Sequence, residues 1–469
     1  MGKRIITVIA SLILAITVPF TAYAIEVNTL DGVIASVEGV ISYKCKELNV
    51  NSTSEILDKL SENAGEFNVD WYYIALSQYK VNCKNEKSVK SLKTAVEKYY
   101  DKGLNNVKAT DLQRVALALS ACKADITDIS GKNLLADATY NRAKYKPLDA
   151  QGVNSLSYAL LLLDSKRYKI PDKAEDNRDT IIKAILDCEL ENGGFSLFGN
   201  GADIDLTSIV LQALAPYKND SKVKNCVNRA LEILSKRQDS SGAYKSFSSL
   251  PTAETTAQVI LALTSLKINP INDTRFIKNG NTLLDGLNNF RLQSGAYCHI
   301  TGYSENNIAT YQSFCAMISV YRLLNGNKSF FDFTDDIESN THSVNSKIKQ
   351  SISKIKSTKS TVNKQKTVKE KQSSSKSYNS VSENKTSEIN DVKNNKKTDK
   401  SSVSKKKPLV SKTETEETSD EKVLTIGGYD IHNPKDETEN SSTSPLYINS
   451  IILICAYIVL FFLKSGGKR

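Results

Sequence analysis

Apolar residues recur at helical spacing along most of the chain between residues 25 and 335. In residues 190–217 (LENGGFSLFGNGADIDLTSIVLQALAPY), a Gly-Gly-Phe turn precedes apolar positions three or four residues apart, which predicts a helix. The stripe consists of Leu206, Ile209, Val210, Ala213, Leu214 and Tyr217. Because Ile204 and Leu211 add apolar surface outside this stripe, we expect the helix to be covered on more than one side.

The same unit returns at SSGAYKSFSSLPTAETTAQVILALTSL and at QSGAYCHITGYSENNIATYQSFCAMISVY, so a helical hairpin is the repeated element of the fold. Buried inner helices are predicted to begin near residues 71, 111, 153, 205, 254 and 309. Outer helices, each with one apolar face, are predicted at residues 30–48, 54–60, 88–100, 134–141, 177–190, 222–236 and 276–290. Six hairpins spaced 40 to 55 residues apart can close into a ring, which needs no capping repeat.

The first 24 residues predict a secretory signal. Lys3 and Arg4 precede an apolar run, and the small residues that end at Ala24 form a cleavage site. We therefore expect the mature protein to begin near residue 25 and to be exported.

Residues 446–463 predict a membrane-spanning helix. They are apolar apart from Asn449 and Ser450, and at ~1.5 Å per residue they just cross a hydrocarbon layer of ~30 Å. Residues 464–469 carry Lys464, Lys468 and Arg469, which favours a cytoplasmic C-terminus. The chain is thus expected at the cell surface, as a single-pass membrane protein with residues 25–335 outside the cell.

Residues 336–445 are rich in Ser, Lys, Thr, Asn and Glu, a composition that cannot bury enough apolar surface to fold. Residues 346–412 hold 19 Lys against 5 acidic residues, whereas residues 413–440 hold 9 acidic residues and 2 Lys. We expect a disordered linker, which either only spaces the folded part from the membrane or contacts an anionic cell wall through its basic part.

Charge is unevenly distributed. The whole chain has a formal net charge of +10, but residues 25–335 hold 36 Lys and Arg against 36 Asp and Glu. A neutral folded domain gives no electrostatic reason to expect nucleic acid as a partner.

The eight cysteines do not have the paired spacing of a disulfide framework or of a metal site. Cys455 lies in the expected membrane helix, which leaves an odd number outside the membrane. We expect Cys188 and Cys226 on the apolar stripes of their helices, where a thiol packs as a small hydrophobic group.

The Gly-aromatic turns at residues 193–195, 242–244 and 295–297 resemble those of prenyltransferase and squalene-oxidase repeats. Segments such as ISGKNLLADATYNR and DIDLTSIVLQALAPY resemble secreted, surface-attached members of this family in Gram-positive bacteria. The resemblance covers residues 25–335 and implies an all-α (α/α)6 toroid, also described as terpenoid cyclase-like, in which inner helices surround a ligand-binding funnel. Because one toroid serves several unrelated functions, the resemblance implies a fold more strongly than an activity.

Family members that cyclise terpenes protonate an alkene with an Asp-x-Asp-Asp motif at the start of an inner helix. The matching run here is Asp203-Ile204-Asp205-Leu206, in which Asp205 aligns with the proton donor and Leu206 replaces the last acid. The other interpretation is that Asp203 or Asp205 caps the helix by accepting hydrogen bonds from its first N–H groups.

Family members that transfer prenyl groups hold zinc with Asp, Cys and His. This chain has three histidines, and only His299, beside Cys298, lies in the expected toroid. No group of residues has metal-ligand spacing, so neither a metal site nor a cofactor is expected.

Polar and aromatic residues at the starts of the predicted inner helices would meet at one rim of a toroid. An aromatic and carboxylate rim around a concave mouth suits a small ligand or a glycan. The candidate ligand-binding residues are Asp70, Trp71, Asp111, Gln151, Asn154, Asp205, Glu254 and Tyr311. The other interpretation is that these are ordinary helix-start acids and core aromatics.

The function expected from the sequence is non-catalytic binding of a small ligand, a glycan or a partner in the toroid mouth. One alternative is a terpene-cyclase or prenyltransferase-like enzyme with Asp205 as the acid. The other is a structural or adhesive surface module.

Overall fold

Helices form nearly all the regular structure in the computed structural model, which describes residues 26–79, 81–197, 201–245, 250–335, 424–426 and 429–431. The prediction of an all-α chain is confirmed for these residues. The described strands are two short pairs, β1 (Tyr244–Lys245) with β2 (Pro251–Thr252), and β3 (Leu424–Ile426) with β4 (Tyr429–Ile431). Both pairs are antiparallel.

The predictions for the two ends of the chain fall outside the described residues. These are the signal at 1–24, the membrane helix at 446–463 and the tail at 464–469. The linker predicted at 336–445 is described only at β3 and β4, where apolar residues alternate with polar ones on both sides of a Gly-Gly dipeptide, a sequence signal of a hairpin. Among the described residues, no helix combines the length and apolar composition needed to cross a bilayer.

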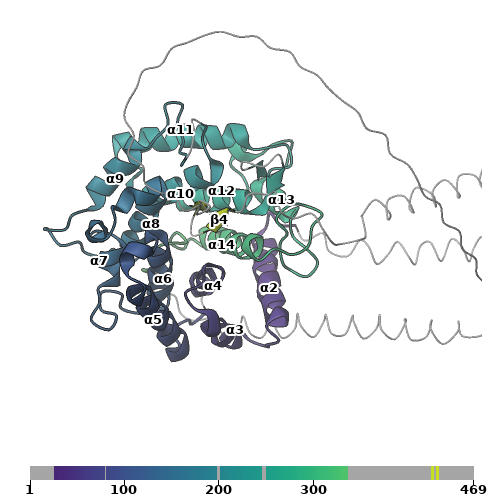
Figure 1. Cartoon of the computed structure of the whole chain (residues 1–469). Helices are drawn as coiled ribbons and strands as arrows, with labels where there is room; N and C mark the ends of the chain where they lie inside the picture. The colour runs from purple at the N-terminus through teal and green to yellow at the C-terminus, as the bar shows by residue number, and fades with distance from the viewer. Residues whose placement is uncertain are drawn as a thin grey trace, which may run out of the picture. The chain divides into compact units, whose positions relative to one another are not determined.

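Six helices are buried on nearly all sides, and each begins within four residues of a predicted inner helix. They are α4 (Phe67–Gln78), α6 (Ala109–Ala121), α8 (Gly152–Ser165), α10 (Ile204–Leu214), α12 (Ala253–Ser265) and α14 (Asn307–Leu324). In α8 and α12 the buried positions run almost without interruption, because neighbouring helices cover every face. Figure 1 shows these helices at the centre of the helical part, with the remaining helices around them.

The surrounding helices are α2 (Leu30–Glu47), α3 (Thr53–Leu60), α5 (Glu86–Asp101), α7 (Leu134–Ala138), α9 (Arg178–Asp187), α11 (Ser221–Arg237) and α13 (Leu283–Asn288). The longer ones bury one face and expose the other, whereas the short α7 and α13 are mostly buried. In α5, for example, Leu92 and Val96 are buried, whereas Lys90 and Glu97 are exposed. The side-chain oxygen of Asn85 caps this helix by accepting a hydrogen bond from the Ser88 N–H.

The outer helix predicted at residues 276–290 is wrong in its first half. Thr274–Phe276 form a 3-10 turn, a bridge between Lys278 and Asn281 follows, and α13 begins only at Leu283. Asn279 and Gly280 both have positive φ angles, which a right-handed helix cannot accommodate. Cys188 also departs from the prediction: it is an exposed residue at the end of α9, whereas Cys226 is buried as expected.

Contacts among the six inner helices form a closed cycle. Each of α4, α6, α8, α10 and α12 contacts the next, and α14 contacts both α12 and α4. The first helix, α2, packs on the last inner helix, α14. Aromatic rings fill the seam between α4 and α14: ring centroids are 6.3 Å apart for Tyr72 and Tyr311, and 5.9 Å apart for Tyr72 and Phe314.

Polar contacts also join residues far apart in the sequence. Asn28 donates to both carboxylate oxygens of Asp285 at 3.0 Å, and the Thr282 hydroxyl donates to the Asn28 side-chain oxygen at 2.7 Å. The Arg291 guanidinium donates to the Ala35 carbonyl at 3.1 Å. The N-terminal helix is therefore held against the loops around α13 by specific bonds as well as by apolar packing.

The segment after α14, residues 325–335, returns across the ends of several inner helices. The Phe333 N–H donates to the Ser165 carbonyl at the end of α8 at 2.7 Å, and Lys267, just beyond α12, donates to the Asn327 carbonyl at 2.9 Å. This segment covers one end of the helical cycle and carries Phe330 and Phe331 inward.

A close backbone approach between α2 and the loop before α14 leads to a stability prediction. Gly295 has φ +93°, and a Cβ there would lie 2.2 Å from the Gly39 carbonyl oxygen. Gly280 has a similar φ of +83°, but a Cβ there would meet nothing within 4 Å. We expect Gly280→Ala to cost ~1 kcal/mol of unfolding free energy from backbone strain alone, and Gly295→Ala to cost ~1–3 kcal/mol more because backbone must move.

Urea denaturation of the two variants measures the difference. Equal destabilisation by both substitutions would contradict the close packing of α2 against this loop.

Candidate functional site

Two of the predicted rim carboxylates, Asp70 and Asp111, share a buried arginine. The Asp70 side chain is fully buried and accepts hydrogen bonds from Arg114 Nε at 3.1 Å and from the Gly65 N–H at 2.9 Å. Arg114 also pairs with Asp111 at 2.8 Å and donates to the Gly65 carbonyl at 2.8 Å. Burial raises the pKa of Asp70, and the charge of Arg114 opposes that rise. This network ties α4 to α6, and it engages both carboxylates with a single guanidinium.

Gln151 and Asn154 lie at the start of α8. The Gln151 side-chain oxygen accepts a hydrogen bond from the Thr110 N–H at 3.2 Å, which joins α8 to the start of α6. Asn154 is fully buried. Gln151 therefore links two inner helices, and Asn154 lies within the packed interior.

The Asp203-Ile204-Asp205-Leu206 run forms the start of α10. Asp203 is the helix cap, because its side chain accepts a hydrogen bond from the Leu206 N–H at 3.0 Å. Burial raises the pKa of Asp203, while the N–H groups of Leu206 and Asp205 counteract that rise. Asp205 lies one residue into the helix, so the two acids of the motif have different environments.

Asp205 and Glu254 come together around His299. The His299 Nδ1 atom lies 2.8 Å from Glu254 Oε2, and the side chains are 49% and 13% exposed, respectively. The bond to Glu254 raises the pKa of His299, and the charge of Asp205 contributes a smaller part of that rise. The Ala253 N–H donates to the His299 carbonyl at 3.2 Å, which fixes the loop beside the start of α12. This acidic cluster can bind or orient a proton-bearing group.

The cluster lacks the geometry of a metal centre. Among the described residues, no group of three or more His, Cys, Asp or Glu side chains is arranged to hold a metal ion. The sequence did not single out His299 as a rim residue, because it follows a Gly-Ala-Tyr turn whose counterparts in the other repeats have no histidine.

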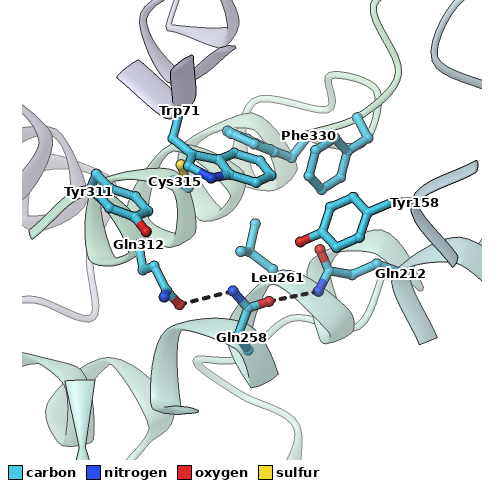
Figure 2. Close-up of a pocket in the computed structure, with 10 residues that line it drawn as sticks. Trp71, Tyr158, Gln212, Gln258, Leu261, Tyr311, Gln312, Cys315 and Phe330 are labelled. Atoms are coloured by element: carbon cyan, nitrogen blue, oxygen red, sulfur yellow. Dashed lines mark hydrogen bonds between the residues drawn. The ribbon is translucent and has the colours of Figure 1, made fainter. Parts of the chain in front are cut away.

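A cavity lies where five inner helices and the returning segment meet. In this form it has room for about one water molecule. Its lining comprises Trp71, Tyr158, Gln212, Gln258, Leu261, Tyr311, Gln312, Cys315, Phe330 and Phe331. Two predicted site residues, Trp71 and Tyr311, are therefore brought together, and none of the described residues in the lining is charged. Figure 2 shows the aromatic rings around this space with the three glutamines along one side.

The three glutamines form a chain of hydrogen bonds with a defined direction. Gln212 Nε2 donates to Gln258 Oε1 at 3.1 Å, and Gln258 Nε2 donates to Gln312 Oε1 at 2.9 Å (Figure 2). Gln212 Nε2 also donates to the Ser208 carbonyl at 3.2 Å, and a carbonyl can only accept. The helix backbone therefore sets the orientation of the whole chain, and the Gln312 amide contributes its NH2 group at the far end.

Trp71 adds a second hydrogen-bond donor. Its side chain is 4% exposed, and its Nε1–H has no partner among the described residues. The Trp71 ring centroid lies 6.1 Å from that of Tyr158 and 6.2 Å from that of Phe331. A buried N–H without a partner is costly, so a ligand or water with an acceptor atom would be stabilised here.

The sequence analysis missed Tyr158 and the three glutamines. The available signal was a glutamine inside an otherwise apolar inner helix, as in IVLQAL, TTAQVI and TYQSF. Buried polar residues of this kind need a partner, and here each glutamine supplies one for the next.

The His299 environment predicts a measurable pKa. Glu254→Gln removes the negative charge that stabilises the imidazolium, so the pKa of His299 should fall toward its ordinary value of ~6.5. Because the pKa is raised in the folded state, this bond stabilises the fold fully below pH ~6.5, and the effect is lost as pH rises through the folded-state pKa. NMR titration of the imidazole signals measures the change, with His299→Gln used to assign the His299 signal.

The matched control is Asp205→Asn, which should lower the pKa of His299 less than Glu254→Gln does, because Glu254 makes the direct bond. A pKa that Glu254→Gln leaves unchanged would refute the pairing.

Comparison with known proteins adds no relative. No family model matches the sequence, and no curated protein is significantly similar to it.

Proposed function

We propose that residues 25–335 form an (α/α)6 toroid of the prenyltransferase and squalene-oxidase repeat type, which binds a small neutral ligand in its central cavity. The observation that carries this proposal is the uncharged cavity itself, in which three directed glutamines and an unpartnered indole N–H face aromatic rings. Such a lining combines apolar contact area with a few oriented polar groups, as small-molecule sites do.

The closed cycle of contacts from α4 to α14 and back to α4 supports the toroid. The pairing of α2 with α14 supports it further, because an open solenoid would leave its first and last helices apart. The Gly-aromatic turns that precede α10, α12 and α14 are the repeat feature on which the family assignment depends.

The cavity lining indicates the chemistry of the ligand. Without a charged residue to offset desolvation, an ionised group would be strongly disfavoured in this space. The donors in the lining include Trp71 Nε1 and the NH2 group of Gln312, so the ligand should present carbonyl, hydroxyl or ether oxygens. The flanking rings of Tyr158 and Phe331 suit a flat, partly apolar body, such as the face of an acetamido sugar.

Phe330 and Phe331 limit what the cavity can hold. Their rings lie 5.1 Å apart, both line the cavity, and Phe331 packs edge-on against Trp71. A ligand larger than water therefore requires residues 330–331 to move outward. We propose that the ligand replaces one of these rings rather than filling an existing hole.

The placement of the toroid follows from the ends of the sequence. A cleaved signal at 1–24, a membrane helix at 446–463 and a charged linker at 336–445 would display the toroid on the outer face of the cell. The basic part of the linker would contact an anionic cell wall.

A second candidate function is an acid-catalysed cyclisation of an isoprenoid with Asp205 as the acid. One observation favours it: Asp205 lies close enough to the His299–Glu254 pair for its charge to raise the pKa of that imidazole. Conversion of a squalene-like substrate that Asp205→Asn abolishes would establish the enzyme, and the lack of any conversion by the wild-type protein would exclude this candidate.

Trp71 is the only tryptophan of the chain, and its fluorescence therefore reports on the cavity directly. We expect N-acetylglucosamine to give a saturable change in Trp71 fluorescence, and its acidic counterpart N-acetylmuramic acid to bind at least ~10-fold more weakly because of its carboxylate. Phe331→Ala should tighten binding of the neutral sugar, because the ring no longer competes for the space.

Gln312→Leu should weaken binding of the neutral sugar by ~10-fold, the effect of losing one buried hydrogen bond. The matched control is Gln113→Leu, which alters a buried glutamine that bonds to the Ala138 and Ser155 carbonyls outside the cavity. Equal binding of the neutral and acidic sugars, or an affinity that neither Phe331→Ala nor Gln312→Leu changes, would refute the proposed site.

A further inference from the structure

A second pocket, with an empty volume of ≈ 990 Å³, lies where α4 and α6 end. It shares no lining residue with the central cavity. The ends of the two helices are joined by a hydrogen bond from the Ser77 hydroxyl to the Ala121 carbonyl at 2.8 Å. Its lining comprises Ser77, Gln78, Val81, Asn82, Cys83, Lys84, Ser120, Ala121, Lys123, Asp332, Phe333 and Asp335.

Two cysteines meet at this pocket. Cys83 lines it, and Cys122 caps α6 between the lining residues Ala121 and Lys123. The Cys83 thiol donates to the Tyr73 carbonyl at 3.6 Å and interacts directly with the Cys122 thiol. Both are free thiols and both are buried. Cys83 therefore lines a solvent-connected pocket and also contacts a second thiol, that of Cys122.

The charges around the pocket favour the binding of an anionic molecule. A lysine directly follows each cysteine, and both Lys84 and Lys123 line the pocket. Neither forms an ion pair with another of the described residues.

The acidic residues of the lining are already engaged. Asp335 pairs with Arg322 and lies 3.7 Å from Lys328, and Asp332 lies 3.9 Å from Arg167. The two lysines therefore supply the uncompensated charge at the pocket.

We propose that Cys83 and Cys122 form a dithiol site that undergoes thiol–disulfide exchange with an anionic low-molecular-weight disulfide admitted by this pocket. The inference goes beyond ligand binding in the central cavity and does not depend on it. It concerns residues at the opposite ends of α4 and α6 from the Asp70–Arg114 network.

The reaction balances in two displacements. The Cys83 thiolate attacks one sulfur of the small disulfide, the S–S bond breaks, and one small thiolate leaves and takes up a proton. Cys122, as its thiolate, then attacks the Cys83 sulfur of the mixed disulfide and releases the second small thiol. The protein loses two hydrogen atoms and gains one disulfide, while the small disulfide is reduced to two thiols.

Burial sets the rate of this exchange. It raises the pKa of Cys83 well above its ordinary value, so the thiolate is scarce, while Lys84 and Lys123 attract an anionic reagent to it. Cys188, an exposed thiol at the end of α9, serves as the reference that should form a mixed disulfide with the same reagent.

The test uses the full-length protein in mild detergent, incubated with oxidised glutathione and then alkylated and digested without reduction. We expect mass spectrometry to find a Cys83–Cys122 cross-linked peptide pair, lighter than the two thiol peptides by two hydrogen atoms, and glutathione on Cys188. Cross-linking should raise the thermal midpoint of unfolding by several degrees, because the bridge closes a long loop. If Cys188 is modified while Cys83 and Cys122 both remain alkylated thiols, the proposal is wrong.

Cysteine variants test the order of the two displacements. Cys122→Ser should leave glutathione trapped on Cys83, whereas Cys226→Ser, at another buried thiol, should leave the cross-link unchanged. If Cys122→Ser does not fold, the presence or absence of the Cys83–Cys122 cross-link in the wild-type protein still tests the proposal.

Reagent charge tests the role of the lysines. Oxidised glutathione should form the cross-link several-fold faster than cystamine, its cationic counterpart, and Lys84→Gln with Lys123→Gln should remove that difference. Faster reaction with cystamine in the wild-type protein would overturn the assignment of an anionic reagent.

Discussion

The structure depends on the seam at which the two ends of the helical part meet. Along the rest of the cycle each inner helix packs on a neighbour that follows soon after in the sequence, so those contacts form locally. At the seam, α4 and α2 contact α14, which lies more than two hundred residues further along the sequence, so the contact has a large cost in loop-closure entropy. Tyr72 against Tyr311 and Phe314, and Asn28 against Asp285, supply apolar and directional contacts at that point.

In a closed cycle of buried helices, polar side chains lose their contact with water and need partners inside the protein. Two arrangements supply these partners here. Near the starts of α4 and α6, the buried Asp70 and the partly exposed Asp111 both pair with Arg114, and Gly65 supplies further hydrogen bonds. Charged side chains that are paired and hydrogen-bonded in this way are stable in the interior. Binding a ligand through them would cost free energy, because their present bonds would have to break. In the cavity, by contrast, the glutamines satisfy one another and leave a donor at one end of the chain.

Helix positions could be predicted from the sequence because buried and half-buried helices have different patterns. The six inner helices are buried on nearly all sides and were found to within four residues, whereas the outer helix at 276–290 was predicted through a turn. Its apolar residues keep helical spacing, and only the backbone at Asn279 and Gly280 shows that the helix is interrupted. Asparagine and glycine tolerate a positive φ angle, so the dipeptide was a local signal that the periodicity outweighed.

The candidate site was harder to predict because position along a helix does not determine which way a side chain faces. Asp70, Trp71 and Asp111 all lie near helix starts, yet Trp71 lines the cavity while both acids bind Arg114. His299 was considered only as a zinc ligand, because its partner Glu254 lies 45 residues away in the sequence. Contacts of this kind depend on how neighbouring helices are staggered, which a single sequence does not encode in any local pattern.

The returning segment, residues 325–335, closes the cavity in this structure, and it is also the part that a bound ligand would displace. Packed as they are, Phe330 and Phe331 act as core residues that complete the centre of the helical part. The bond of the Phe333 N–H to Ser165 and those of Arg322 to the Lys328 carbonyl and Asp335 hold them there. The Trp71 N–H has no partner among the described residues beside those rings, and an apolar residue of similar size would avoid the cost. The unsatisfied donor makes the packed state less favourable than it could be, and a ligand that accepts the N–H bond recovers that free energy. The same contact therefore argues both for a stable closed form and for an occupant that displaces it.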